Sequence, residues 1–482
     1  MKELFELAPI FSDYMVFQAN KPIRVFGTCK KGAEIIITFP HQEVKIKTKE
    51  ETFSVEISAM DMTRVGFAFS VSSKKQKTVL YNCLVGEVFF IAGACCAAFP
   101  LKEGYLPVIR EYPMVRFLSI PRSPYENAHE EFPELFQQES KWKILGPEYA
   151  PDFSAFGFHL ASFLRDSLSS PIGIVLLAEP ETSMFSFVSE NEILKSTKLR
   201  RILISYQKEI DKYDSSQHYD LVYEQEMGYA QASSKLSLLP MGPKHHNRPS
   251  GMYSVMNRYL KRVSFAGAIY YQGTTDLEHV DLAEEAIWRM VSSWRTLLDL
   301  PNLPFFHIQL AGRTLMEDKI LKAAKFREAQ AKCMDISDAV YMTSAVDLGD
   351  KLEPISRDQL PLAERMANLI LEKVYHIGKN SMCPMIFSHQ IQKEKLLINT
   401  HQNSLNLVSR SRQNTGFYQS YDGITFEEIQ SVQLMTNQIA IPYDPDVIEI
   451  RYGYHDFPML DLYSANGLPL LPFRLELEKE AH

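Results

Sequence analysis

Cysteine is scarce in this sequence, with six residues among 482. No two of them have the C-x-x-C spacing of a zinc site or a redox pair, since Cys95 and Cys96 are adjacent and the others are dispersed. This spacing excludes the disulfide framework of a small secreted scaffold. The first residues also lack the apolar core of a signal peptide, because Glu3, Glu6 and Pro9 interrupt it. We therefore expect reduced thiols and a cytoplasmic location.

Long apolar runs and blocks of basic residues are also missing. No segment approaches the roughly 18 consecutive apolar residues that a membrane-spanning helix needs. The formal net charge is −8 and no Lys/Arg cluster stands out, so neither a nucleic acid nor an anionic membrane is an expected partner. The glycine-rich G-x-x-x-x-G-K-[ST] phosphate loop is absent, and no cofactor is expected.

The chain does contain enough apolar residues for a large core. Hydrophobic residues make up 45% of it, which predicts two or three domains. Short alternating segments, such as Ile23-Arg24-Val25-Phe26-Gly27, are separated by turn-forming residues near the start. This rhythm predicts an N-terminal β domain over residues 1–83.

A different pattern follows, in which compact apolar runs alternate with amphipathic helices. After Ser154, a candidate N-cap, Phe156 and Leu160 recur at helical spacing. Strands that alternate with helices predict a parallel sheet covered on both faces, with the site at the carboxyl ends of the strands. The apolar runs expected to form strands are 84–92, 172–177, 266–271, 305–310 and 339–342.

This pattern defines an α/β domain over residues 84–377. Residues from about 190 to 247 are charged and mostly helix-permissive, which indicates an insertion with a solvated face. After Gly378 the β rhythm returns, and we expect a C-terminal β domain over residues 378–482.

Short motifs occur along almost the whole chain. They are 7–18, Val85-Gly86-Glu87-Val88-Phe89, 248–253, Tyr270-Tyr271-Gln272-Gly273, 303–305, 309–310, Arg327-Glu328-Ala329-Gln330, Arg451-Tyr452-Gly453-Tyr454 and 466–469. In content and order they resemble the sialate O-acetylesterase family, a branch of the SGNH hydrolases. The resemblance implies a three-layer α/β domain between two β segments, and an acetylated sugar as ligand.

Members of that family deacetylate sugars. A serine attacks the acetyl carbonyl, a histidine takes its proton, an aspartate orients the histidine, and nearby donors hold the oxyanion. The family's nucleophile loop reads Gly-Gln-Ser-Asn, and the aligned residues here are Gly93-Ala94-Cys95-Cys96. Cys95 therefore stands at the serine position. A thiol attacks only as thiolate, which needs a nearby base or a lowered pKa, and we interpret Cys95 as an inert thiol.

The second loop of the family reads Trp-Gly-Gly-Thr, and Glu179-Pro180-Glu181-Thr182 aligns with it. Pro180 has no N–H to donate to an oxyanion, and the carboxylates of Glu179 and Glu181 would repel one. The alternative is that the two glutamates bind a cation or a sugar hydroxyl.

The remaining two loops also differ at their chemical residues. The third, Gln-Gly-Glu-Ser-Asn in the family, keeps Gly273 but has Asp276 in place of the amide donor, and we interpret Asp276 as a solvated loop residue. In the fourth, Glu353 stands at the histidine position, with Asp350 three residues before it. A glutamate can act as a general base. A surface or capping role for Glu353 and Asp350 is the interpretation we favour.

Three histidines are further candidates. His245 and His246 lie in a polar loop without a carboxylate or cysteine at ligand spacing, so we expect them to be solvated and expect no metal. His307 lies in an apolar run and is interpreted as a core histidine. Whether it could serve Cys95 as a base is left open by the sequence.

Three hypotheses about function follow. The first is a homologue of the sialate O-acetylesterases that is non-catalytic or binds carbohydrate. The second is an active carbohydrate O-acetylesterase that uses Cys95, with Glu353 or another residue as base. The third is a purely structural interaction protein. The sequence does not indicate the sugar or the oligomeric state.

Overall fold

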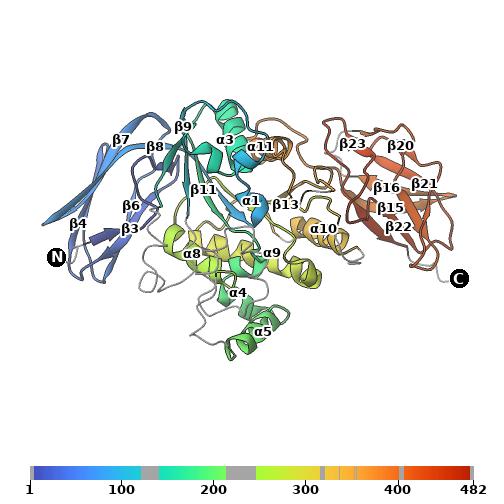
Figure 1. Cartoon of the computed structure of the whole chain (residues 1–482), viewed down its shortest axis with the longest axis horizontal. Coiled ribbons are helices and arrows are strands. Elements are labelled where there is room, and N and C mark those ends of the chain that lie inside the picture. Colours follow the sequence, from blue (N-terminus) through green and yellow to red (C-terminus); the bar gives the residue numbers. More distant parts are fainter. Residues whose placement is uncertain are drawn as a thin grey trace. The chain divides into compact units, whose positions relative to one another are not determined.

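The structure is a computed structural model that describes residues 5–120, 140–212, 246–314, 321–335, 337–351, 353, 355–400 and 406–477. The chain forms two compact units. The first comprises Met1–Thr275 and Glu285–Phe305, and the second comprises Asp276–Glu284 and Phe306–His482. Figure 1 shows their elements coloured along the sequence. Within the described residues, no helix is both long and apolar enough to cross a membrane.

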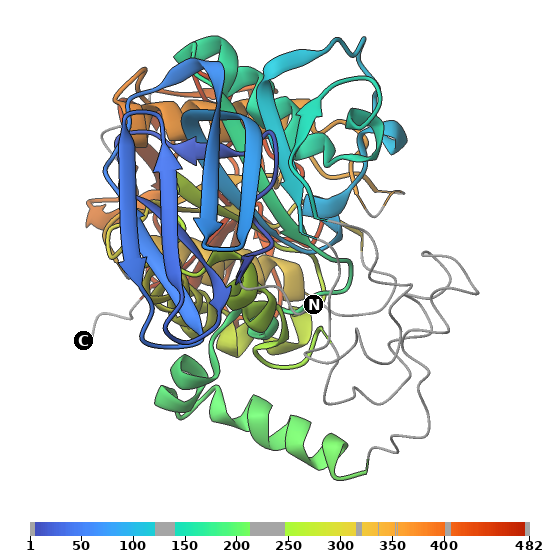
Figure 2. The ribbon, with the colours of Figure 1, turned by 90° about the vertical axis from the view of Figure 1, so that its left-hand side faces the viewer.

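Most N-terminal strands of the first unit form antiparallel pairs, as the alternating sequence predicts, whereas β2 pairs in parallel with β8. β3 lies between β1 and β6, and β4 lies between β5 and β7. Side chains alternate between core and solvent along β6, and the phenylalanine rings of Phe39 and Phe69 stack with centroids 4.6 Å apart. In Figure 2 these blue strands face the viewer. Their bounds are β1 Phe5–Leu7, β2 Val16–Gln18, β3 Ile23–Cys29, β4 Glu34–Phe39, β5 Gln42–Lys47, β6 Thr52–Ile57 and β7 Thr63–Ser73.

One long strand, β8 (Gln76–Gly93), joins these strands to the α/β sheet. Its first part pairs antiparallel with β7, and its last seven residues pair in parallel with β11 (Ile172–Ala178). β8 therefore runs without a break through the boundary expected at residue 83. The division of the chain into three domains stays a prediction.

The α/β sheet of the first unit has the order β10-β9-β11-β8-β12. β9, β11, β8 and β12 are parallel, and β10 adds an antiparallel edge. The further elements of this unit are β9 Tyr112–Ser119, β10 Lys143–Leu145, β12 Gly267–Tyr271, α1 Cys95–Ala98, α3 Ala155–Leu168, α4 Glu190–Lys195, α5 Arg200–Ile210, α8 Gly251–Leu260 and most of α9 Val280–Leu298.

Helices cover both faces of this sheet. Neighbouring residues of a strand point to opposite faces. Tyr270 of β12 packs against Trp294 of α9, whereas Tyr271 packs against Phe156 of α3. Figure 1 likewise shows α3 on one side of the strands and α8 and α9 on the other. This is the three-layer arrangement that the alternation of strands and helices predicts.

Local sequence explains where the first of these helices begins. The hydroxyl oxygen of Ser154 accepts a hydrogen bond from the Gly157 N–H at 3.0 Å, so Ser154 is the N-cap of α3, as predicted. The helix ends at Ser169, which has a left-handed backbone, and Pro171 follows.

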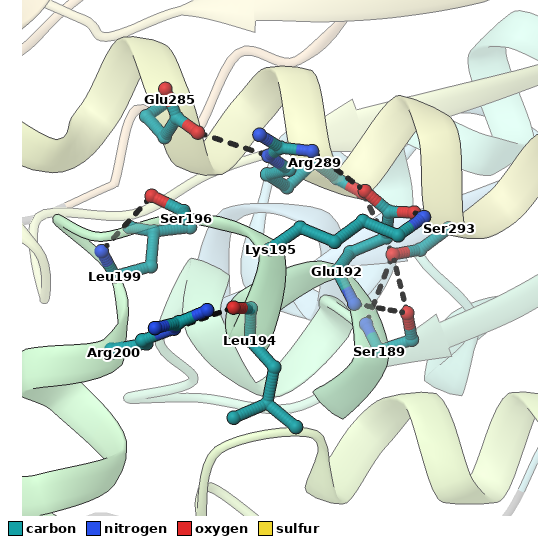
Figure 3. A network of polar contacts seen from close by, with 10 residues as sticks. All are labelled: Ser189, Glu192, Leu194, Lys195, Ser196, Leu199, Arg200, Glu285, Arg289 and Ser293. Carbon is teal, nitrogen blue, oxygen red and sulfur yellow. Dashed lines mark hydrogen bonds and ion pairs between the residues drawn. The ribbon is translucent and has the colours of Figure 1, made fainter.

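The described part of the charged insertion contains α4 and α5. A polar network fixes α4 to α9 (Figure 3): Arg289 contacts Glu192 at 3.1 Å, and the Ser189 N–H donates to the Ser293 hydroxyl at 3.0 Å. No residue of α5 is fully buried. This agrees with the expected solvated face, although most of residues 213–247 lie outside the described part of the chain.

In its described residues, the second unit contains two neighbouring strands and two α-helices, followed by the C-terminal strands. The C-terminal strands form sheets in the orders β15-β16-β21-β20, β17-β23 and β19-β18-β22-β24. The elements are β13 Phe305–Gln309, α10 Lys322–Lys332, β14 Val340–Ser344, α11 Leu360–Tyr375, β15 Ile386–Gln392, β16 Lys395–Thr400, β17 Leu407–Ser409, β18 Phe417–Ser420, β19 Glu427–Glu428, β20 Gln433–Met435, β21 Gln438–Pro442, β22 Glu449–Tyr452, β23 Leu462–Ser464 and β24 Phe473–Glu476.

Several residues of the family-like motifs support the fold of this unit. The amide of Gln330 accepts from the Leu310 N–H at 2.9 Å and donates to the Ile308 carbonyl at 3.2 Å. The guanidinium of Arg327 is buried and donates to the Asp456 carbonyl at 3.1 Å. Such bonds satisfy buried polar backbone groups, which are costly to leave unpaired.

Candidate functional site

The site expected from the sequence begins where β8 ends. Gly93 is its last residue, Ala94 is the N-cap of α1, and Cys95 is the first residue of that helix. The Ala94 carbonyl accepts from the N–H groups of Ala97 and Ala98 at 3.0 and 3.2 Å, which closes the turn. Cys95 is half-buried. It therefore lies at the carboxyl end of a central parallel strand, where sites of such sheets form.

Gly93 lets the end of β12 approach this turn closely. Its backbone φ is +152°, and a Cβ at this position would lie 2.0 Å from the Tyr271 carbonyl oxygen. The Ala94 N–H donates to the same oxygen at 3.2 Å. Only glycine fits both the dihedral angle and the contact.

Gly273 follows directly in the third loop and lies against the thiol. A Cβ at Gly273 would be 3.2 Å from the Ala94 Cβ and 3.5 Å from the Cys95 sulfur. The structure therefore brings together two of the predicted site residues, Cys95 and Gly273. A side chain at position 273 would crowd the sulfur.

The second loop joins the same corner through its backbone. The Glu179 N–H donates to the Gly93 carbonyl at 3.1 Å, and Glu179 is buried while Glu181 is exposed. Glu181 has a φ of 59°, in the left-handed region that favours glycine. The family has glycine at the aligned position. The second loop thus has a backbone conformation that favours glycine, although a glutamate occupies the position.

Asn247 stabilises the second loop and was missed by sequence reasoning. Its side-chain amide donates to the Glu181 carbonyl at 2.9 Å and accepts from the Ser183 N–H at 2.7 Å. The hydroxyl of Thr182 donates to the Glu179 carbonyl. Asn247 is 66 positions from Glu181 in the chain, and the polar composition of its segment carries no signal of this contact.

Asp276, Asp350 and Glu353 belong to the second unit. Asp276 was expected to be a solvated loop residue, and this is wrong, because it is only 1% exposed. Its carbonyl accepts from the His279 N–H at 2.8 Å and starts the short helical turn Leu277–His279, which leads into α9. The entry into a buried helix places the aspartate inside.

Asp350 and Glu353 lie on the surface of their unit. The Asp350 carboxylate accepts from the Glu353 N–H at 3.1 Å, as a capping aspartate does. Glu353 forms an ion pair with Arg357 at 3.4 Å, in which both side chains are about half exposed. Asp347 of the same loop is instead buried in a bidentate pair with Arg365, at 2.7 and 2.8 Å.

Of the predictions for the histidines, one is confirmed and one is wrong. His307 is buried, as expected of a core histidine, and burial lowers its pKa to about 3. It is therefore neutral at ordinary pH. His246 was expected to be solvated, and this is wrong, because it is 6% exposed. It directly precedes Asn247, whose contacts hold the segment against the second loop. His245 lies outside the described residues.

Among the described residues, no group of three or more His, Cys, Asp or Glu side chains is placed to hold a metal ion. Glu179 is buried and Glu181 is exposed, and the binding of a cation or a sugar hydroxyl by these two residues stays a prediction.

Comparison with solved structures shows the fold. A carbohydrate acetylesterase from Xanthomonas citri matches with a TM-score of 0.80 at 20% identity, over 98% of this chain and 100% of that one. The α/β fold with additional β sheets predicted from the sequence is thereby confirmed. Similarity of fold at this level of sequence identity does not show that the two proteins share an activity.

Other matches are weaker. A protein from Arabidopsis thaliana gives a TM-score of 0.35 at 15% identity, over 60% of this chain and 99% of that one. A carbohydrate esterase family 2 enzyme from Corynascus thermopiles (Myceliophthora fergusii) gives 0.30 at 10% identity, over 72% and 89%. No family model and no curated protein matches the chain.

Proposed function

We propose that this protein is a non-catalytic homologue of the carbohydrate O-acetylesterases of the sialate type, which binds carbohydrate at the loops around Cys95. The observation that carries the proposal is the corner formed by β8 and the second and third loops. Gly93 lies against the Tyr271 backbone and Gly273 against the Ala94 and Cys95 side chains, while a thiol and a proline occupy two chemical positions of this corner.

Loss of hydrolysis follows from the chemistry of these residues. Pro180 cannot donate an N–H, and removal of one oxyanion donor typically costs about 2.7–4 kcal/mol of transition-state stabilisation. Glu353, at the position of the base, is half exposed and paired with Arg357. A thiol attacks only as the thiolate, which a serine esterase site is not built to supply.

The alternative is an active carbohydrate O-acetylesterase in which Cys95 attacks the acetyl carbonyl and Glu353 or another residue takes the proton. The position of a half-buried thiol at the end of β8 favours it. Hydrolysis of p-nitrophenyl acetate separates the two functions. We expect the wild-type rate to equal that of Cys95→Ala; a rate that falls at least a hundredfold in Cys95→Ala would establish the alternative.

The reactivity of the thiol gives an independent test. Burial raises the pKa of Cys83 to about 12 and of Cys383 to about 11, and burial also raises that of Cys333, so these three remain protonated. Alkylation by iodoacetamide should therefore be followed in a Cys29→Ser, Cys96→Ala background. We expect Cys95 to react no faster than a model thiol.

A restoration variant tests the role of the second loop. Ala94→Gln, Cys95→Ser, Cys96→Asn and Glu353→His together restore two loops to the pattern of the family. We expect little activity from it, because Pro180 still removes a donor. Robust hydrolysis by this variant would show that the second loop is not the obstacle.

Carbohydrate binding separates the proposal from a purely structural role. We expect wild-type protein to bind acetylated glycans on an array, and Gly273→Val to bind them more weakly, because the added side chain meets the Cys95 sulfur. An array without any bound glycan would favour the structural interaction protein.

A further inference from the structure

The first unit contains a cavity of about 630 Å³ that none of the four loops lines. We call it the Tyr14 pocket. Its walls are the segment from Phe11 to Tyr14, the pair Val79 and Leu80, Glu111, and two short segments at 141–144 and 146–149. The volume falls within the roughly 300–1,000 Å³ typical of small-molecule sites.

Tyr14 has an unusual backbone in this pocket. Its φ is 68°, a left-handed value that is a genuine outlier for a bulky residue, and its side chain is 38% exposed. Strain of this kind persists only where the surroundings fix it, and it is concentrated at ligand sites. Tyr14 therefore lines the pocket from a backbone conformation that is unfavourable without the surrounding contacts.

A buried arginine fixes Tyr14. Arg116 is 3% exposed, donates to the Tyr14 carbonyl at 3.3 Å and to the Asn82 carbonyl at 3.1 Å, and lies 5.4 Å from the centre of the Tyr14 ring. The Tyr14 N–H donates to the Tyr81 carbonyl at 3.0 Å. These contacts hold both the N–H and the carbonyl of the strained residue in place.

The opposite wall is equally well fixed. The buried Trp142 donates its backbone N–H to the Ser12 hydroxyl at 2.8 Å and its indole N–H to the Ile10 carbonyl at 2.9 Å. The Lys143 ammonium lies 4.5 Å from the centre of the Tyr149 ring. The two walls are thus tied together, and the pocket is preformed.

The lining has aromatic rings and charges of both signs. Tyr14 and Tyr149 supply rings, Asp13, Glu111 and Glu148 supply carboxylates, and Lys141 and Lys143 supply ammonium groups. A strongly charged ligand would meet repulsion from one sign or the other. Sugar hydroxyls both donate and accept, so they suit carboxylate and ammonium neighbours, while the C–H face of a sugar packs on an aromatic ring.

We propose that the Tyr14 pocket is a second saccharide-binding site, for a neutral oligosaccharide, separate from the loops around Cys95. Because it shares no residue with those loops, it is independent of whether Cys95 acts as a nucleophile.

The test is saturation-transfer NMR and calorimetry on the full chain with lactose, cellotriose, maltotriose and chitotriose. We expect at least one of them to bind wild-type protein, and Tyr14→Asn to weaken that binding about tenfold through loss of the ring. Asparagine tolerates the left-handed backbone, so this variant should fold at least as well as wild type. Tyr421→Asn, which removes a similarly exposed tyrosine in the second unit, is the matched control and should bind normally.

Two outcomes would overturn the proposal. One is that none of the four saccharides binds the wild-type protein. The other is that Tyr14→Asn binds as wild type does while Gly273→Val does not, which would place the sugar at the Cys95 loops. Binding that survives Gly273→Val but is weakened in Tyr14→Asn supports the second site, whatever the glycan array shows for the proposed function.

Discussion

Glu181 occupies a backbone conformation that glycine adopts without cost. A non-glycine residue at positive φ costs roughly 1–2 kcal/mol of folding free energy. Glycine avoids this strain, but it loses more conformational entropy on folding, which offsets part of the gain. Since the side chain is exposed, no packing is lost when it is removed. We expect Glu181→Gly to be more stable than Glu181→Ala by about 1 kcal/mol in urea denaturation, because alanine keeps the strain. Equal stability of the two variants would mean that the loop is not strained.

At the scale of elements, the start of the fourth loop is connected to α11 by a buried ion pair. The side chains of Arg365 and Asp347 are 11% and 8% exposed, and Arg365 also donates to the Ser344 carbonyl at 2.9 Å. Arg365→Ala leaves the Asp347 charge buried without its partner, so we expect a loss of about 3–5 kcal/mol in the free energy of unfolding.

Arg357→Ala is the matched control for that variant. It breaks an exposed pair in the same region, with Glu353, and should cost under about 1 kcal/mol. Similar losses for the two arginine variants in chemical denaturation would contradict the assigned roles.

A second element-scale prediction concerns acid. Burial alone would raise the pKa of Asp461, but hydrogen bonds from the Ser411 N–H at 2.6 Å, the Ser409 hydroxyl at 2.7 Å and the Thr415 N–H at 3.0 Å outweigh it and hold the pKa below its ordinary value. A carboxyl with a lowered folded-state pKa stabilises the fold above its unfolded pKa of about 3.9, and this stabilisation is lost as the pH falls through the folded pKa.

Asp461→Asn should therefore be less stable than wild type near neutral pH but lose less stability on acidification below about pH 4. Urea midpoints measured along a pH series provide the comparison, with the exposed Asp61→Asn as control. Parallel pH profiles for wild type and Asp461→Asn would show that this carboxylate is not the acid-sensitive group.

At the scale of the whole molecule, charge limits the choice of partner. With a net charge of −8, the protein should repel polyanions. We expect it to pass through a heparin column at low salt and to leave a duplex DNA unshifted in a gel. Retention that weakens steeply with added salt would reveal a basic surface that the composition does not indicate.

The order of strands and helices could be predicted from the sequence because periodicity is local. The runs at 172–177 and 305–310 became β11 and β13, and Ser154 caps α3, since apolar spacing and capping depend on near neighbours. Glycines at positions 93 and 273 were identified through the family-like motifs. Their contacts give the reason, which is that another loop approaches too closely for a side chain.

Burial of single polar residues could not be predicted in the same way. Asp276 and His246 lie in loop segments of the sequence, yet both are buried, and burial depends on tertiary packing that residue type and short-range spacing do not specify. The contact of Asn247 with the second loop and the left-handed Tyr14 in its pocket have the same origin.

The sequence by itself determined the α/β class, the β segments at either end, and which residue types stand at the four loops, because these depend on residue identity and short-range spacing. Only the tertiary structure decided which side chains meet. It brought Gly273 against Cys95, left Glu353 on the surface of its unit, and built a pocket from residues more than a hundred positions apart. Those outcomes depend on long-range packing, in which each contact is fixed by the whole set of neighbours rather than by the residues beside it in the chain.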